Sequence, residues 1–411
     1  MRRKHGHLRR GVSLHGLCCS LLPLWLMNDV SDQSALESHF HQSTTTNSAN
    51  GGCYLKFCAP NPATAGSAAP KMQLSVKDLV ESNCLSCVPS EYVCLKTHED
   101  SMLSETETIP TIDFSQLTSP NPNQRSKASL QLAHACRHWG FFMLTNHGVS
   151  ETLRDEVIRA AHDFYDLAEE EKRKYAGGQL FDPIKYGTSF NPRVDKNLFW
   201  RDYLKIHVHP QFHAPTKPPA FSEILEEYCK KSREVIGKLL KGISKSLGLE
   251  ESYIHKRLNL ESGSQLVVIN FYPPCPKPEV TMGLPPHTDY GLLTLLVQNE
   301  LNGLQVQYNG KWVPVHPLPN CILVNTGDHM EILTNGKYKS VVHRAVVNKK
   351  AVRISIGTAH GPPLDTVLSP APELLSDDNP PAYRAITYRK YVQLQKNHPL
   401  DRKSCLDRIR L

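Results

Sequence analysis

The chain has 411 residues, of which 40% are hydrophobic, so it is long enough and apolar enough to bury a substantial core. The formal net charge is +7, but residues 1–71 hold seven Lys and Arg against three Asp and Glu, which leaves 40 basic against 37 acidic residues elsewhere. This near balance calls for no nucleic-acid or membrane partner, and we expect an ordinary soluble protein.

Residues 1–71 are expected to be a disordered or non-native leader. A basic start, "MRRKHGHLRR", precedes a short apolar run, "LCCSLLPLWLM", which resembles a signal peptide but lacks a convincing cleavage site. Residues 28–70 are rich in small and polar residues and cannot offset the entropy of folding. An upstream extension before a true start at Met72 explains the pattern at least as well. The 12 cysteines show no paired zinc spacing, so we expect reduced thiols in a cytoplasmic protein.

Residues 72–255 are predicted to form a mainly helical region. A helix is expected in "LSVKDLVES", and another over "RSKASLQLAHACRHWG" should stop at Gly140. Ser150 is placed to cap a third helix, "ETLRDEVIRAAHDFYDL", and residues 221–250 repeat the apolar stripe of an amphipathic helix. Two short strands are expected, in "IPTIDFSQL" and "FFMLTNHGV".

From Gln265 onward the pattern becomes that of strands, and residues 256–411 are predicted to form the second domain. Short runs rich in β-branched residues are separated by turn signals, and Asn309 with Gly310 is a strong hairpin signal. Helices followed by evenly spaced strands predict an α+β fold, a jelly-roll of the cupin kind (a double-stranded β-helix) with flanking N-terminal helices. The predicted strands are "QLVVINFY", "LLTLLVQ", "GLQVQY", "KWVPV", "CILVNTG", "SVVHRAVV" and "RISIGTA".

A possible metal site begins at "PPHTDYG", where His287 and Asp289 would point to the same side of an extended backbone. His343 in "VVHRAVV" is the candidate third ligand, although a lone histidine in an apolar strand is more often a satisfied core residue. Arg353 and Ser355 alternate onto one face of a nearby strand, where a guanidinium would need an anion. Two histidines and one carboxylate form the facial arrangement of non-haem Fe(II) oxygenases, with zinc as the rival metal.

This ordered set of motifs resembles the plant 2-oxoglutarate and Fe(II)-dependent dioxygenase superfamily. The resemblance covers roughly residues 72–411 and includes "HWGFFMLTNHGV" and "NFYPPCP". It implies an Fe(II) enzyme that consumes 2-oxoglutarate and O2, releases succinate and CO2, and uses ascorbate as its reductant. It further implies that iron is bound by His287, Asp289 and His343, and 2-oxoglutarate by Arg353 and Ser355 with help from Tyr272 and Asn270.

The substrate is expected to lie against "FDPIKYGTSFNPRVDKNLFWRDYLKIHVHP", which resembles the flavanone 3-dioxygenase-like and salicylate-hydroxylase-like branches of the family. We therefore expect hydroxylation of a phenolic or other specialised metabolite, with Arg201 or Lys205 available to a polar end. Two other functions stay open: an oxidase of the 1-aminocyclopropane-1-carboxylate oxidase type that does not use 2-oxoglutarate, and a non-catalytic ligand-binding cupin. The candidate pocket aromatics are Phe181, Tyr186, Phe190, Phe199, Trp200 and Tyr203, of which Trp200 is expected to pack in the core.

Overall fold

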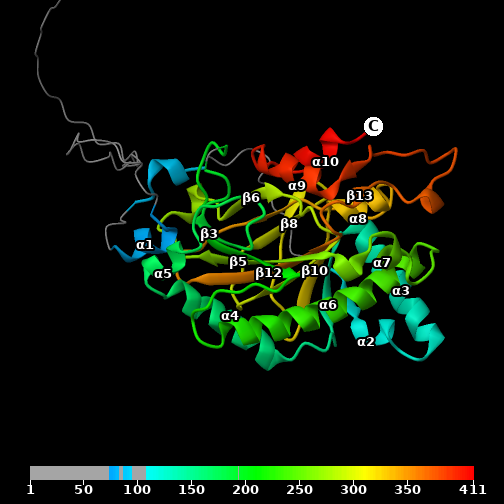
Figure 1. Cartoon of the computed structure of the whole chain (residues 1–411), viewed down its shortest axis with the longest axis horizontal. Coiled ribbons are helices and arrows are strands. Elements are labelled where there is room, and N and C mark those ends of the chain that lie inside the picture. Colours follow the sequence, from blue (N-terminus) through cyan, green and yellow to red (C-terminus); the bar gives the residue numbers. More distant parts are fainter. Residues whose placement is uncertain (1–73, 83–86, 95–107, 193) are drawn as a thin grey trace, which may run out of the picture. The chain divides into compact units, whose positions relative to one another are not determined.

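The computed structural model describes residues 74–82, 87–94, 108–192 and 194–411 (Figure 1). The chain divides into two units, residues 1–54 and 55–411, and every described residue belongs to the second. The predicted leader, residues 1–71, lies outside the described residues. Within the described part of the chain, no helix is both long enough and apolar enough to cross a membrane.

An eight-stranded sheet forms the centre of the second unit. Its central strands β7, β12 and β5 are antiparallel neighbours, and β12 pairs with β5 along its whole length, from Arg353 opposite Tyr272 to Gly361 opposite Ser264. The strand order is β1 (Thr111–Asp113), β2 (Phe141–Thr145), β10 (Ile322–Thr326), β7 (Leu293–Gln298), β12 (Arg353–Gly361), β5 (Ser264–Tyr272), β4 (Asp202–His209) and β3 (Ile184–Thr188).

A smaller sheet of four strands completes the jelly roll, in the order β6 (Leu284–His287), β11 (His343–Ala345), β8 (Leu304–Tyr308) and β9 (Lys311–Pro314). The predicted hairpin joins β8 and β9, and both Asn309 (φ 48°) and Gly310 (φ 76°) adopt the left-handed conformation that such a turn requires. A two-stranded ribbon pairs β13 (Val367–Leu368) with β14 (Ile386–Thr387). The predicted α+β jelly-roll fold is therefore confirmed.

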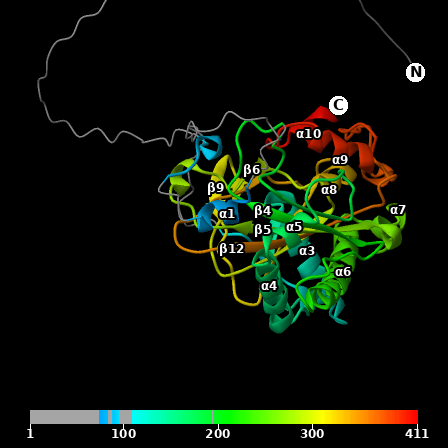
Figure 2. The ribbon, with the colours of Figure 1, turned by 60° about the vertical axis from the view of Figure 1, so that its left-hand side comes forward.

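Helices α4 and α6 run along one face of the large sheet (Figures 1 and 2), where their apolar stripes join the main core. Ser150 caps α4 as predicted, because its hydroxyl accepts a hydrogen bond from the backbone N–H of Leu153. The α-helices are α1 (Val76–Glu81), α2 (Phe114–Leu117), α3 (Pro122–His138), α4 (Glu151–Tyr165), α5 (Glu169–Arg173), α6 (Phe221–Ser246), α7 (Tyr253–Arg257), α8 (Asp328–Leu333), α9 (Tyr388–Lys396) and α10 (Ser404–Arg408). Short 3-10 helices span Ser90–Tyr92, Leu260–Ser262, Pro278–Val280 and Pro372–Leu374.

Two features differ from the sequence-based expectations. Strands β3 and β4 lie in a segment for which no strand was predicted, and β4 joins the large sheet through β5. Alternate buried residues of β4, such as Leu204 and Ile206, pack in the main core. Cys87 is disulfide-bonded, which corrects the expectation of reduced thiols for this residue. The free cysteines in the described part of the chain are Cys94, Cys136, Cys229, Cys275, Cys321 and Cys405.

Gly140 lies just after the end of α3, where the backbone near Lys339 and Val341 packs closely against it. It has a φ of +60°, and a Cβ atom added there would lie 2.4 Å from the carbonyl oxygen of Lys339 and 2.6 Å from Val341 Cγ2. Gly248 has a similar φ of +78° but open space around the same position. A comparison of alanine substitutions at Gly140 and Gly248 therefore distinguishes the cost of the left-handed backbone from the cost of the steric clash.

We expect Gly248→Ala to lower the free energy of unfolding by about 1–2 kcal/mol, the cost of a left-handed alanine. Gly140→Ala should cost roughly 1–3 kcal/mol more, because the added methyl group overpacks against Lys339 and Val341. Urea denaturation of both variants measures the difference. Equal losses in the two variants would contradict a role for the close approach at Gly140.

Candidate functional site

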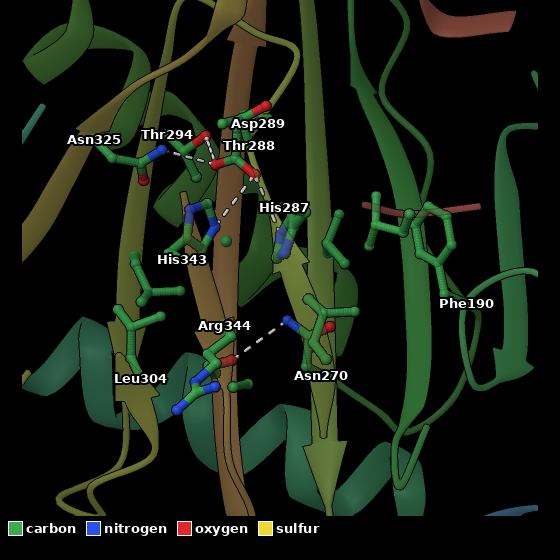
Figure 3. Close-up of a pocket in the computed structure, with 18 of the residues that line it drawn as sticks. Phe190, Asn270, His287, Thr288, Asp289, Thr294, Leu304, Asn325, His343 and Arg344 are labelled. Atoms are coloured by element: carbon green, nitrogen blue, oxygen red, sulfur yellow. Dashed lines mark hydrogen bonds and ion pairs between the residues drawn. The ribbon is translucent and has the colours of Figure 1, made fainter. Parts of the chain in front are cut away.

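Two histidines of the small sheet face each other across neighbouring strands. His287 ends β6 and His343 begins β11, and the two are directly opposite in register, with ring centroids 4.2 Å apart (Figure 3). Each Nδ1 lies within hydrogen-bond distance of a backbone carbonyl two residues earlier, that of Pro285 at 2.8 Å and that of Val341 at 3.1 Å. An Nδ1–H donated to these carbonyls leaves both Nε2 lone pairs free for a metal.

Asp289 completes the group from the loop that follows β6. Its Oδ1 lies 3.9 Å from Nε2 of His287 and 3.7 Å from Nε2 of His343. Its Oδ2 accepts hydrogen bonds from Thr294 Oγ1 at 2.7 Å and from Asn325 Nδ2 at 2.8 Å. One ligand atom from each of the three residues lies within 4.8 Å of the others, so two nitrogens and one oxygen converge as a facial metal site requires.

The environment favours the protonation states that bind a metal. Burial, with the neighbouring His343, lowers the pKa of His287, which keeps its imidazole neutral. Burial alone would raise the pKa of Asp289, but the two histidines and the hydrogen bonds from Asn325 and Thr294 outweigh it and lower that pKa. The site therefore presents a neutral imidazole at His287 and a carboxylate at Asp289, the forms in which these side chains act as ligands.

A buried guanidinium lies in the same cavity, on the large sheet. Arg353 of β12 is 2% exposed, donates from Nη2 to Gln298 Oε1 at 2.6 Å and lies 5.1 Å from the ring centre of Tyr272 on β5. Its Nε and Nη1 have no hydrogen-bond partner in the described structure. Burial also lowers its pKa below the ordinary arginine value. Unpartnered buried N–H groups on a planar cation fit an anionic ligand such as a carboxylate.

Ser355 and Asn270 lie beside this guanidinium, as the predicted alternation requires. The two residues face each other in register across β12 and β5, and Asn270 Nδ2 donates to Ser355 Oγ at 3.3 Å. All of the residues predicted to bind iron or 2-oxoglutarate line one cavity between the two sheets: His287, Asp289, His343, Arg353, Ser355, Tyr272 and Asn270.

The candidate substrate residues divide between this cavity, a second cavity and the core. Phe190, Arg201 and Lys205 line the first cavity, whereas Phe181 and Tyr203 line the second. Trp200 is fully buried against Tyr92, with ring centroids 5.2 Å apart, so the expectation that it packs in the core is confirmed. Tyr186 is buried in the main core, and Phe199 is buried next to Trp200 in the chain. Cavity residues that the sequence did not single out include Phe141, Tyr290, Thr294, Leu304 and Asn325.

Two family models match the chain in the regions that build this site. Residues 263–362 match the 2OG-Fe(II) oxygenase superfamily, and residues 109–224 match the N-terminal region described as non-haem dioxygenase in morphine synthesis. The chain is 43% identical over 313 residues to 2-oxoglutarate-dependent dioxygenase 19 of Oryza sativa subsp. japonica, an alignment that covers 76% of the chain and 93% of the relative. The chain belongs to the 2OG-Fe(II) oxygenase superfamily. It is a 2-oxoglutarate-dependent dioxygenase with Fe(II) as its cofactor, as predicted.

Other similar proteins extend this result. Flavanone 3-dioxygenase 2 of the same rice subspecies is 40% identical to this dioxygenase over 307 residues, covering 74% of the chain and 87% of the relative. The crystal structure of JOX2 in complex with 2OG, Fe and JA matches with a TM-score of 0.75 and 31% identity, covering 83% of this chain and 99% of JOX2.

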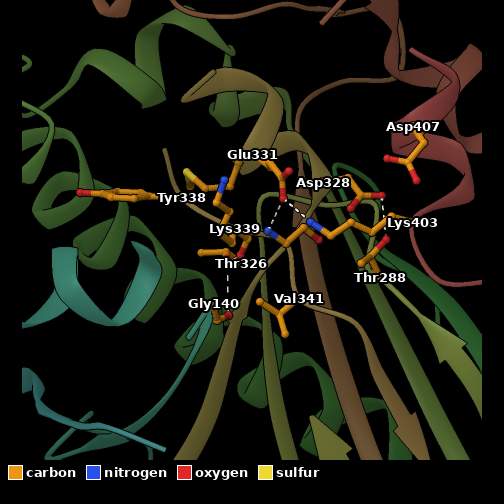
Figure 4. Close-up of polar contacts among 12 residues, drawn as sticks. Gly140, Thr288, Thr326, Asp328, Glu331, Tyr338, Lys339, Val341, Lys403 and Asp407 are labelled. Carbon is orange, nitrogen blue, oxygen red and sulfur yellow. Dashed lines mark hydrogen bonds and ion pairs between the residues drawn. The ribbon is translucent and has the colours of Figure 1, made fainter. Parts of the chain in front are cut away.

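In this dioxygenase the C-terminal segment holds the end of β6 and the loop after it, which carry the candidate ligands His287 and Asp289. Thr288 lies between them and donates to Asp328 Oδ2 at 3.2 Å, while Tyr391 of α9 donates to the same oxygen at 2.7 Å. The backbone N–H of Arg402 donates to the carbonyl of Pro286 at 2.8 Å. Figure 4 shows a second anchor nearby, where Lys403 reaches the buried carboxylate of Glu331 at 2.7 Å. The end of the chain is thus tied to the site by hydrogen bonds to buried groups.

Removal of the Tyr391 hydroxyl should weaken this attachment. Burial raises the pKa of Asp328 to about 6, so its carboxylate is ionised at pH 8 and the hydrogen bond from Tyr391 is charge-assisted. We expect Tyr391→Phe to lower the free energy of unfolding at pH 8 by about 1.5–3 kcal/mol. The matched variant Tyr338→Phe, which loses a hydrogen bond to the neutral Ser246, should cost about 0.5–1.5 kcal/mol. Chemical denaturation compares them, and a smaller loss for Tyr391→Phe would contradict the attachment.

Proposed function

We propose that His287, Asp289 and His343 hold the Fe(II) of this dioxygenase. The proposal is supported by the convergence of Nε2, Nε2 and Oδ1 in one buried cavity, with the other polar atom of each side chain already bonded to protein. Thr294 and Asn325 would keep Oδ2 of Asp289 away from the metal and so fix the carboxylate as a single-oxygen ligand. Three positions of an octahedral ion would then stay open for other ligands.

Arg353 and Ser355 would bind the distal carboxylate of 2-oxoglutarate, with Tyr272 and Asn270 alongside. The observation that carries this assignment is the pair of unpartnered N–H groups on the buried Arg353, in the same cavity as the metal site. A buried cation with free donors is costly unless an anion occupies the site. A clamp of this kind supports use of 2-oxoglutarate over the oxidase and the non-catalytic cupin alternatives.

The bound Fe(II) and 2-oxoglutarate supply the oxidising chemistry, in which O2 is consumed and the keto acid becomes succinate and CO2. The residues of the chain would bind and orient the metal and 2-oxoglutarate, and they would exclude water from the reacting centre. The candidate metal ligands His287 and His343 lie on the small sheet and Arg353 lies on the large sheet, so 2-oxoglutarate would bind with its distal carboxylate toward the large sheet. Apolar residues such as Phe141, Leu296 and Leu304 line the remaining wall and keep the reacting centre dry. Ascorbate as reductant stays a prediction.

The substrate is proposed to be a phenolic or flavonoid-like metabolite that becomes hydroxylated. Aromatic rings from three parts of the chain line the cavity, namely Phe141, Phe190 and Tyr290. Such surfaces suit a flat aromatic substrate. The similarity to flavanone 3-dioxygenase 2 supports the same class.

The first test is the visible absorption of the Fe(II)-loaded protein without oxygen, as 2-oxoglutarate is added. We expect a saturable charge-transfer band, because a band of this kind requires the keto acid to chelate the metal. Arg353→Met should raise the 2-oxoglutarate concentration at half saturation by roughly 10-fold or more, since it removes a charge-assisted hydrogen bond. Arg257→Met is the matched control, because Arg257 also lies over a tyrosine ring, that of Tyr253, but outside the cavity. If iron binds but no charge-transfer band forms, the result would contradict 2-oxoglutarate chelation and favour an oxidase or a non-catalytic binding protein.

A second test addresses the groups that orient Asp289. Thr294→Val keeps the side-chain shape but removes the donor to Oδ2, so the dissociation constant for Fe(II) should rise by about 10-fold, as for other residues that orient metal ligands. Thr358→Val is the control, because Thr358 lies on β12 of the same large sheet and its buried hydroxyl interacts with Tyr228 of α6, not with Asp289. Titration with Fe(II) under anaerobic conditions gives both constants. Unchanged Fe(II) affinity in Thr294→Val would show that Asn325 alone positions the carboxylate or that Asp289 is not a ligand.

A further inference from the structure

One face of β4 carries more positive charge than its surroundings neutralise. Lys205 lies directly opposite Lys185 in the register of β4 and β3, an arrangement in which like charges repel. Tyr203 and His207, two residues to either side, share the face of Lys205 because side chains alternate along a strand. The opposite face of β4 packs in the core through Leu204 and other apolar side chains. The basic face is therefore the one that the strand turns toward the cavities.

Lys205 is held between two aromatic rings, each of which also lies near another cation. Its Nζ is 5.1 Å from the ring centre of Tyr203 and 5.3 Å from that of Phe190. Arg201 lies 5.1 Å from the Tyr203 ring, and Lys396 of α9 lies 5.3 Å from the Phe190 ring. Throughout the described ranges no carboxylate oxygen lies within 4.0 Å of Lys205 Nζ. The aromatic faces thus position the ammonium group without neutralising it.

The electrostatics agree with this geometry. Burial, followed by repulsion from Arg201, Lys396 and Lys185, holds the pKa of Lys205 well below its usual range. The Arg201 guanidinium donates hydrogen bonds to neutral acceptors, namely the carbonyl oxygen of Ser189 and Oδ1 of Asn270. A negative charge placed beside Lys205 would relieve this repulsion.

Lys205 stands where two cavities meet. Lys205, Leu266 and Tyr290 line both the cavity with the metal site and a second cavity of about 310 Å³. The lining of the second cavity is also basic, with Lys185, Lys396, His207, His209 and His213. Among the described residues its acidic member is Asp182, whose Oδ2 already accepts from the backbone N–H of Gln179 at 2.6 Å.

Strand β5 runs along the first cavity, so its register shows how far apart Arg353 and Lys205 lie. Its alternate residues Tyr272, Asn270, Val268 and Leu266 all line the first cavity. Tyr272 pairs with Arg353 of β12, whereas Val268 pairs with Lys205 of β4. At about 3.3 Å per residue these two positions are roughly 13 Å apart along the strand. Lys205 is thus displaced from Arg353 toward the second cavity, and one 2-oxoglutarate held by Arg353 does not account for it.

We propose that the substrate of this dioxygenase carries an anionic oxygen group, a carboxylate or a sulfate ester, and that Lys205 binds this group where the two cavities meet. The inference rests on the proposed function, because it places the reacting aromatic part of the substrate in the cavity with the metal site. Lys185 and Lys396 add positive charge on the side of the second cavity, and the larger volume there accommodates the remainder of an elongated molecule.

The test compares anionic probes with neutral partners that share the same aromatic part. Calorimetric titration of the full-length protein, loaded with Fe(II) and saturating 2-oxoglutarate without oxygen, gives dissociation constants for 4-hydroxycinnamate and its methyl ester. A second pair, 4-methylumbelliferyl sulfate and 4-methylumbelliferone, tests a sulfate ester. We expect the anion of at least one pair to bind about 10-fold more tightly than its neutral partner, as a charge-assisted contact would give. The pair that shows the preference identifies the group.

Three variants assign the preference to Lys205. Lys205→Met should abolish the advantage of the anion, Lys205→Arg should keep most of it, and Lys238→Met should behave as the wild type. Lys238 is the matched control because it also lies over an aromatic ring, that of Phe114 at 5.8 Å, but on the exposed side of α6 and outside both cavities. No anion preference in the wild-type protein overturns the inference, as does a preference that survives in Lys205→Met.

The 2-oxoglutarate charge-transfer band, measured on the same samples, separates this inference from the proposed function. A normal band without anion preference overturns the role of Lys205 and leaves the proposed function in place. An absent band overturns the proposed function, and an anion preference that depends on Lys205 would then still establish the binding site. The wild-type comparison needs no variant, so a folding defect in Lys205→Met does not remove the test.

Discussion

The candidate site depends on the different contacts made by the two carboxylate oxygens of Asp289. Oδ2 is tied to Thr294 and Asn325, which belong to β7 and β10 of the large sheet, while Oδ1 faces the histidines of the small sheet. The carboxylate therefore couples the two sheets, and the three ligand atoms meet only when both sheets are correctly spaced. The large sheet packs on the main apolar core, while Thr288, next to Asp289, is tied through Asp328 to Tyr391 of the C-terminal segment.

The charges in the cavity are a cost to the fold that only ligands can offset. Arg353 is almost completely buried with two free N–H groups, and Lys205 is packed between rings without a nearby acid in the described structure. Leaving such groups unpaired disfavours folding, whereas an apolar side chain at either position would not. Their presence is understandable if binding was favoured over stability at these positions. The large main core provides the stability that permits it.

Local alternation was enough to predict most of the site from the sequence. His287 with Asp289, and Arg353 with Ser355, are pairs separated by one residue on extended backbone, and the structure brings both pairs to one cavity. Thr294 and Asn325 could not be predicted, because their role depends on the register between β7 and β10, which residue spacing does not determine. Strand β4 escaped prediction because its basic and aromatic face hides the alternation of Leu204 and Ile206 within a segment that reads as a loop.

The arrangement of charge along β5 is consistent with separate positions in one cavity for 2-oxoglutarate and for the proposed anionic substrate. Positive charge lies at both ends, from Arg353 beside Tyr272 and from Lys205 beside Val268, while the carboxylate of Asp289 lies near the two histidines. An anion is repelled by Asp289 unless a metal compensates its charge, so before metal binding the two cationic ends are the favourable places for negative groups. In the proposed arrangement, 2-oxoglutarate would lie between Arg353 and the metal, and an anionic group on a longer aromatic substrate would lie at Lys205. The two ends would thus be distinguished by two cations of the large sheet, the buried Arg353 and the half-buried Lys205.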